Sequence, residues 1–149
     1  GDFGAVLSDH IHRAQVLRRD LEGRPLAAPV VYPGAIERTA FVERLEAKGY
    51  IRLVMDLDGP ARGQVSALKF VRSPVRPMVH LVLDMGGLQR DSLEAHMQER
   101  LAGLEANAIV RIQLRGRGAE DARLTLTASR LRALAPPTME AWVAPESAT

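Results

Sequence analysis

Two closely spaced prolines near the middle of the chain constrain its fold most. Pro74 and Pro77 both lie within Ser73–Pro77, and a proline has no backbone N–H to donate in a central strand. The residues before this segment alternate as strands do, whereas those after it combine strand and helix periods. We therefore predict two structural units, residues 1–74 and 75–144, followed by a disordered tail at 145–149.

The first unit is predicted to consist mostly of strands. Apolar residues alternate over Gly49–Leu57, and after a turn Val65–Val71 returns as an antiparallel partner. Three earlier strands are expected at Ala5–Leu7, Gln15–Asp20 and Pro29–Tyr32. We expect the first of these to be buried and to emerge at the surface at its carboxyl end.

The second unit is predicted to be a two-layer α+β module, in which helices cover a sheet. Leu93, Met97, Leu101 and Leu104 recur at helical spacing between two stretches that alternate as strands. The expected order is β-α-β-(β)-α-β: strand 78–85, helix 93–104, strand 109–117, an optional short strand 124–126, helix 127–134 and strand 139–143.

Two histidines, His10 and His12, follow the first expected strand. In extended backbone, side chains two residues apart point the same way, so both imidazoles would face one side. Such a pair has metal-ligand geometry. The alternative is a surface strand that carries two histidines only for their polarity. We interpret the other two histidines, His80 and His96, as structural.

Five blocks of the sequence resemble the SbcD family, the nuclease subunits of the SbcC and SbcD complex that repairs DNA double-strand breaks. The members of this family are relatives of the Mre-eleven nuclease and have a calcineurin-like metallophosphoesterase fold. The blocks, which span about residues 5 to 143, are His10-Ile11-His12-Arg13 with Gln15, Tyr32-Pro33-Gly34, Ile36-Glu37-Arg38-Thr39 with Phe41, Lys48-Gly49-Tyr50, and Arg76-Pro77-Met78.

The resemblance implies a strand-rich C-terminal part of a phosphoesterase domain at residues 1–74 and a DNA-binding capping domain at 75–144. It implies manganese-dependent exonuclease and endonuclease activity, with His10 on one of two Mn²⁺ ions and His12 on the other. The family's earlier metal motifs are absent from this sequence, so the site is incomplete here and the chain is expected to be inactive alone. Asp9, Ala35 and Ala40 also depart from the residues usual in the family.

The resemblance further implies DNA as a partner, with the SbcC-type ATPase and a second nuclease subunit as partners of the intact family. On an exposed loop, Arg38 is a candidate phosphate contact, with an exposed Glu37–Arg38 pair as the alternative. The expected outward row Arg111, Arg115 and Arg117 is the second candidate, against the alternative of a solvated strand face.

Composition sets broad limits on the function. The formal net charge is only +2, so no global positive field indicates nucleic acid by itself, although eighteen of the twenty basic residues are arginine. The absence of cysteine is compatible with a reducing cytoplasm, and no apolar stretch approaches the ~18 residues of a membrane span. The chain begins with Gly1 rather than methionine, which suggests a fragment.

Three hypotheses follow from the sequence. The first and favoured one is a fragment of a metal-dependent DNA nuclease. The second is a non-catalytic DNA-binding or regulatory module that keeps the capping unit without an active site. The third is an interaction domain with neither metal nor DNA, which predicts no effect of Mn²⁺ on melting and no salt-dependent retention of DNA.

Overall fold

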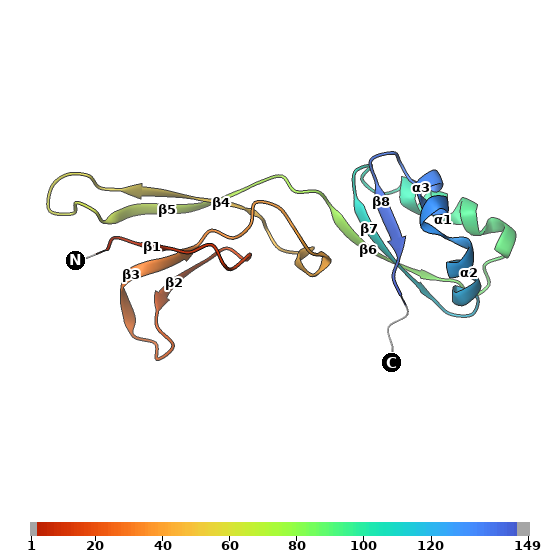
Figure 1. Cartoon of the computed structure of the whole chain (residues 1–149), viewed down its shortest axis with the longest axis horizontal. Coiled ribbons are helices and arrows are strands. Elements are labelled where there is room, and N and C mark those ends of the chain that lie inside the picture. Colours follow the sequence, from red (N-terminus) through yellow and green to blue (C-terminus); the bar gives the residue numbers. More distant parts are fainter. Residues whose placement is uncertain (1–2, 146–149) are drawn as a thin grey trace. The chain divides into compact units, whose positions relative to one another are not determined.

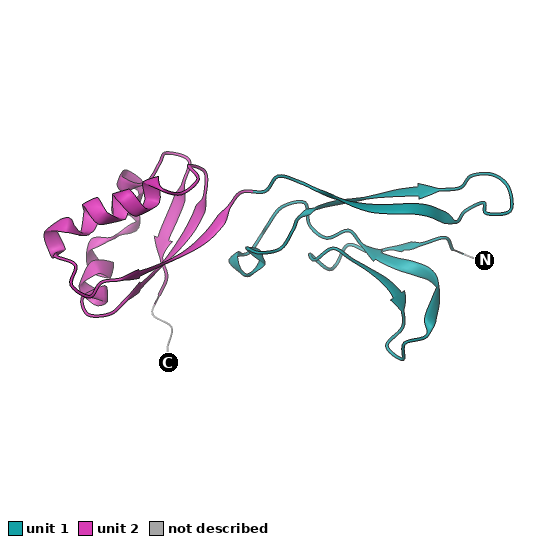
Figure 2. Cartoon of the chain, turned by 180° about the vertical axis from the view of Figure 1, so that it is seen from behind, with its two compact units in different colours: residues 1–75 teal, residues 76–149 magenta. Residues whose placement is uncertain are grey.

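The computed structural model describes residues 3–145, and it separates the chain into unit 1, Gly1–Val75, and unit 2, Arg76–Thr149 (Figures 1 and 2). Within its described residues, unit 1 contains five strands and a single 3₁₀ turn. They are β1 (Val6–Leu7), β2 (Gln15–Arg19), β3 (Pro25–Tyr32), η1 (Phe41–Glu43), β4 (Gly49–Met55) and β5 (Val65–Arg72).

The strands of unit 1 form two sheets. In the first, the order is β1-β3-β2, with β1 parallel to β3 and β2 antiparallel to it. The second is the antiparallel hairpin of β4 and β5, which the alternating pattern predicted. β3 begins at Pro25, earlier than expected, and its second proline, Pro29, is tolerated because the pairing of β2 with β3 is irregular between Leu17 and Arg19.

Unit 1 buries very little apolar surface. Among its described residues, Val31 in the central strand β3 is the one fully buried hydrophobic side chain, whereas Lys48 and Glu43 are buried despite their charges. The expected burial of the first strand is wrong, because Val6 is 44% and Leu7 70% exposed. β1 pairs with β3, yet both of these side chains remain exposed.

Unit 2 contains both helices and strands, which confirms the predicted α+β class. Its elements are β6 (Met78–Asp84), η2 (Arg90–Ser92), α1 (Leu93–Ala102), β7 (Ile109–Arg115), α2 (Ala119–Thr125), α3 (Ala128–Leu134) and β8 (Glu140–Val143). The three strands pair in parallel in the order β6-β7-β8. Parallel neighbours need long crossovers, and the helices provide them on one face of the sheet (Figure 1).

The hydrophobic core of unit 2 lies between this sheet and its helices. Leu93, Met97 and Leu101 are buried on α1, as their spacing predicted, and they belong to one cluster with Val110, Ile112 and Leu114 of β7. Thr127 caps α3 as expected, because its hydroxyl accepts a hydrogen bond from the Arg130 backbone N–H at 3.3 Å.

Two details of the predicted unit 2 are wrong. Strand β7 ends at Arg115 rather than at residue 117, because Gly116 and Gly118 have positive φ angles and turn the backbone out of the sheet. The optional strand at 124–126 is replaced by helix α2 and its end. Leu126 is buried in the core while Leu124 is 76% exposed, which is the pattern of a helix with one covered face. The predicted tail at 145–149 lies, apart from Pro145, outside the described residues.

Candidate functional site

The candidate site is built around the turn that carries His12. The backbone bends at His10, His12 and Arg13 instead of continuing in the extended form that the sequence predicted. The argument that extended backbone makes both imidazoles face one side therefore does not apply. His10 is exposed, and the His12 side chain remains 55% exposed although one of its ring nitrogens is engaged.

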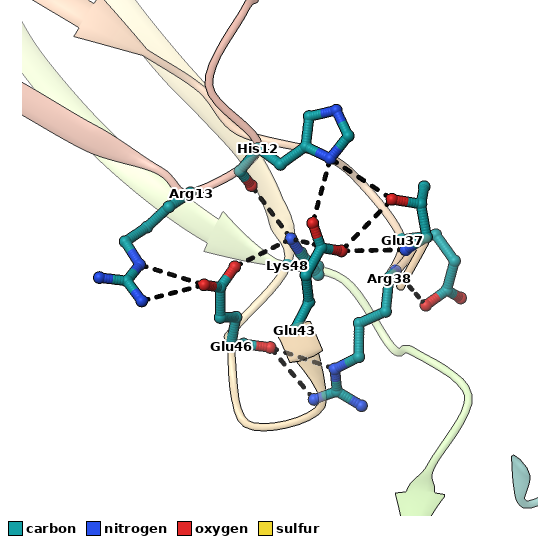
Figure 3. A network of polar contacts seen from close by, with 8 residues as sticks. His12, Arg13, Glu37, Arg38, Glu43, Glu46 and Lys48 are labelled. Atoms are coloured by element: carbon teal, nitrogen blue, oxygen red, sulfur yellow. Dashed lines mark hydrogen bonds and ion pairs between the residues drawn. The ribbon is translucent and has the colours of Figure 1, made fainter. Parts of the chain in front are cut away.

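Glu43 is the main partner of the His12 ring. Its Oε1 lies 3.0 Å from His12 Nδ1, while its Oε2 accepts a hydrogen bond from the Thr39 backbone N–H at 2.9 Å (Figure 3). This carboxylate is buried at the end of η1. The Thr39 N–H above all, together with His12 and Lys48, outweighs desolvation and lowers the pKa of Glu43 to about 2. Glu43 is thus a stable anion.

Lys48 holds the acidic residues and the histidine turn together. Its side chain is only 1% exposed, and its Nζ lies 3.0 Å from the His12 carbonyl oxygen. The same ammonium lies 3.1 Å from Glu46 Oε2 and 3.2 Å from Glu43 Oε2. An ammonium has three donors, so each of them has an oxygen partner. The charge is therefore buried with full compensation.

Two arginines complete the group of contacts around Glu46. Arg13 donates from Nε and Nη2 to Glu46 Oε1, at 3.2 and 3.0 Å, and Arg38 donates from Nε and Nη2 to the Glu46 carbonyl, at 3.3 and 3.1 Å. Hydrogen bonds from Lys48, and next from Arg13, lower the pKa of Glu46. We call this set of residues the His12 cluster: His12, Arg13, Arg38, Glu43, Glu46 and Lys48.

Gly34 allows the loop after β3 to pack on the histidine turn. Its φ is +77°, and a Cβ there would lie 2.9 Å from the His12 carbonyl oxygen and 2.7 Å from the Ala14 nitrogen. The next residue, Ala35, donates its N–H to the same His12 carbonyl at 3.0 Å. A glycine is needed at this position both for its backbone angle and for the close approach.

The structure places the predicted phosphate contacts in two different units. Arg38 is half-buried in the His12 cluster, and its backbone N–H bonds Glu37 Oε1 at 2.7 Å. Arg111 and Arg115 lie on the face of the sheet opposite the core, and Arg115 donates to Gln113 Oε1 at 3.3 Å. Arg117 has left the strand and lies in the turn before α2, so the expected row of three on one strand is wrong for this residue.

The described residues do not form a complete metal site. Within residues 3–145, no three His, Cys, Asp or Glu side chains are grouped so that they could hold a metal ion. His12 nevertheless has the outer partner that metal-bound histidines usually have, a carboxylate on the ring nitrogen away from the metal.

No helix that the structure describes is long and apolar enough to cross a membrane.

Sequence reasoning missed the acidic half of the cluster. It singled out His12 and Arg38 and placed Lys48 in a block of the resemblance, but it assigned no role to Glu43 or Glu46. The two glutamates stand three residues apart beside a lysine, which is a common pattern in solvated turns. The contact of Glu43 with His12 spans 31 residues, and no local pattern encodes it.

No family model matches the sequence, and no curated protein matches it.

Proposed function

We propose that this chain is part of the nuclease subunit of an SbcC/SbcD-type DNA repair complex, with unit 1 bordering a metal centre and unit 2 acting as the DNA-binding cap. One observation carries the proposal. Four sequence blocks that resemble the family, separated along the chain, meet at the His12 turn: the histidine block, Pro33-Gly34, the loop with Arg38 and Thr39, and Lys48.

The reaction class is hydrolysis of a DNA phosphodiester bond. In that reaction a pair of divalent ions, Mn²⁺ in the family, supplies activation of water and stabilisation of phosphate oxygens when bound. Here His10 and His12 would each supply one neutral imidazole as a ligand, and segments absent from this sequence would supply the rest. We accordingly expect no hydrolysis by this chain alone. We further expect a cytoplasmic protein whose partner is DNA, with the SbcC-type ATPase as a partner of the intact family rather than of this piece.

Nuclear magnetic resonance of the histidine rings tests the metal half of this proposal. On titration of the full chain with MnCl₂, paramagnetic broadening should appear first at His10 and His12. His80 and His96, in unit 2, are internal references within the same sample. The double variant His10→Gln/His12→Gln should abolish the early broadening, whereas the matched variant His80→Gln/His96→Gln should leave it unchanged.

The opposite result is equally clear. If Mn²⁺ broadens all four rings at the same concentration, or broadens the unit 2 rings first, unit 1 has no preferred manganese ligand. The nuclease proposal would then fail. Salt-dependent retention of DNA in such a protein would instead support the non-catalytic DNA-binding module, and the absence of retention would support the interaction domain.

A further inference from the structure

Unit 2 has a sheet face that its own helices leave open. Alternate residues of the three strands, such as Leu81 of β6, Ile112 of β7 and Val143 of β8, pack in or against the core on the side of the helices (Figure 1). Successive side chains of a strand point to opposite faces of its sheet. The residues between the core positions therefore lie together on the open face.

One row across the open face combines two aromatic rings and a guanidinium. The register sets His80 of β6 beside Arg111 of β7, and Arg111 beside Trp142 of β8. Neighbouring strands lie about 4.8 Å apart, so the row spans about 10 Å. Trp142 is the only Phe, Tyr or Trp residue in the sequence of unit 2, yet it lies outside the core and is 36% exposed.

The surface beside Trp142 is hollowed. A cavity of about 330 Å³ is lined by Trp142 together with Leu131, Val143 and the guanidinium-bearing Arg123, among others. Apolar side chains form most of this lining. The hollow leaves room next to the indole for a flat, largely apolar ring of a ligand.

The charges of the open face favour a ligand that carries phosphate. Arg111 stands in the middle of the row, and Arg115 follows on the same side of β7. Two acids share the face: Glu140 is paired with Arg76 at 2.8 Å, and Asp84 accepts a backbone N–H of the turn after β6 at 2.9 Å. Three basic against two acidic side chains leave this face positive.

Aromatic rings beside arginines provide the chemistry that binds single-stranded nucleic acid. Unpaired bases stack on aromatic side chains while arginines contact the backbone. The bases of a duplex are stacked on one another, so a duplex presents its phosphates to such a face but not its base planes.

We propose that the open face of unit 2 binds a single-stranded segment of DNA, with bases stacked on Trp142 and His80 and phosphates at Arg111 and Arg115. This inference rests on the proposed function, in which unit 2 is the DNA-binding cap. It adds the substrate class: DNA with unpaired bases is preferred to a blunt duplex.

Tryptophan fluorescence tests the stacking directly, because Trp142 is the only tryptophan of the chain. An oligothymidylate of about 12 nucleotides, within the usual site size, should quench the emission of the full chain. A blunt duplex of the same length should quench it much less at equal occupancy, with occupancy measured by the anisotropy of labelled DNA. Equal quenching by the two forms, or none by the single strand, would overturn the proposal.

Matched variants separate stacking from a general loss of affinity. Trp142→Leu should weaken single-strand binding about tenfold or more and change duplex binding by less than about twofold, because stacking is lost and the phosphate contacts remain. Trp142→Phe keeps an aromatic face and should retain most of the single-strand affinity. Tyr50→Leu removes an exposed ring from unit 1 and should change neither affinity.

The remaining outcomes distinguish this inference from the proposed function. Unchanged single-strand affinity in Trp142→Leu, or an equal loss for both forms of DNA, would overturn the stacking role while duplex binding by the unchanged chain still supports a DNA-binding cap. If Trp142→Leu does not fold, the fluorescence of the unchanged chain and the affinity of Trp142→Phe decide. If the chain binds neither form of DNA, the cap of the proposed function fails, the inference fails with it, and the open face is left to a protein partner.

Discussion

At the scale of single residues, unit 1 depends on ionised side chains to an unusual degree. Lys48 and Glu43 occupy buried positions that apolar residues fill in most small domains. Removing one partner of a buried ion pair leaves the other uncompensated, whereas the intact network satisfies each charge. The local structure around His12 should therefore respond to any change in the protonation of Glu43 or Glu46.

The stability of unit 1 is accordingly expected to fall in acid. The pKa of Glu43 is about 2 when folded, below its ordinary value of 4.5, so the unfolded chain takes up the proton at higher pH. The contribution of Glu43 is fully present above about pH 4.5 and is lost as the pH falls toward 2. The pKa of Glu46 is lowered as well. Protonation of Glu46 at low pH should therefore also decrease the stability of unit 1.

Urea denaturation followed by tyrosine near-ultraviolet circular dichroism measures this, because both tyrosines, Tyr32 and Tyr50, are in unit 1. The urea concentration at the midpoint should decrease as the pH is lowered from 5 to 3. Glu43→Gln should flatten this dependence, whereas Glu22→Gln, at an exposed surface pair with Arg24, should retain it. An equally steep pH profile in the Glu43 variant would contradict the assignment.

At the scale of elements, strand β7 carries the clearest candidate surface for DNA. Its even-numbered residues Val110, Ile112 and Leu114 are buried in the core, so Arg111 and Arg115 lie on the face that the helices do not cover. Register places Arg111 beside His80 of β6 and Trp142 of β8. Arg117 follows in the turn, where Gly116 and Gly118 set the backbone direction.

If these three arginines contact phosphates, their removal should weaken DNA binding and reduce its dependence on salt. Each phosphate contact contributes about 0.9 to the slope of log affinity against log salt, so the triple change to alanine should reduce the slope by up to about 3. Fluorescence anisotropy with a labelled DNA duplex at several salt concentrations measures both quantities.

The matched control removes the same charge elsewhere in unit 2. Arg90, Arg100 and Arg132 are exposed on the elements that cover the other face of the sheet. Their replacement by alanine should change the slope by less than about 1. Equal slopes for the two triple variants would mean that only net charge matters, and the surface on β7 would lose its assignment.

At the scale of the whole molecule, the two units differ in how they are stabilised. The core cluster runs from Leu81 to Met139 and lies entirely in unit 2, whereas the described part of unit 1 fully buries only Val31 among its apolar side chains. Complete burial of one large apolar side chain contributes about 1.5–3 kcal/mol. Unit 2 should therefore resist denaturant better than unit 1.

Two intrinsic reporters allow both transitions to be followed in the intact chain. The single tryptophan, Trp142, lies in unit 2, and both tyrosines lie in unit 1. The tyrosine signal should change at a lower urea concentration than tryptophan fluorescence. Coincident midpoints would show that the chain unfolds as one cooperative body, contrary to this expectation.

Core substitutions in unit 2 provide the control. Leu101→Ala should destabilise unit 2 by about 2–5 kcal/mol and move only the tryptophan transition, because Leu101 is fully buried. Leu124→Ala, which makes the same chemical change at an exposed position, should cost less than about 0.5 kcal/mol.

The sequence by itself determined the features that depend on neighbouring residues. The period of Leu93, Met97 and Leu101 predicted α1, and the hydroxyl of Thr127 predicted the start of α3. The alternation over Gly49–Leu57 predicted the first strand of the β4–β5 hairpin. Local backbone preference and one-sided burial act over a few residues, so their signals are present in any short window.

Only the tertiary structure decided what surrounds His12. Its contacts with Glu43 and Lys48 span 31 and 36 residues and depend on a loop that closes at Gly34. The sequence also could not show that Val6 and Leu7 remain exposed, since an apolar run predicts a strand but not what covers it. Burial and long-range pairing are properties of the assembled chain, and they decide which of its charged residues form a site.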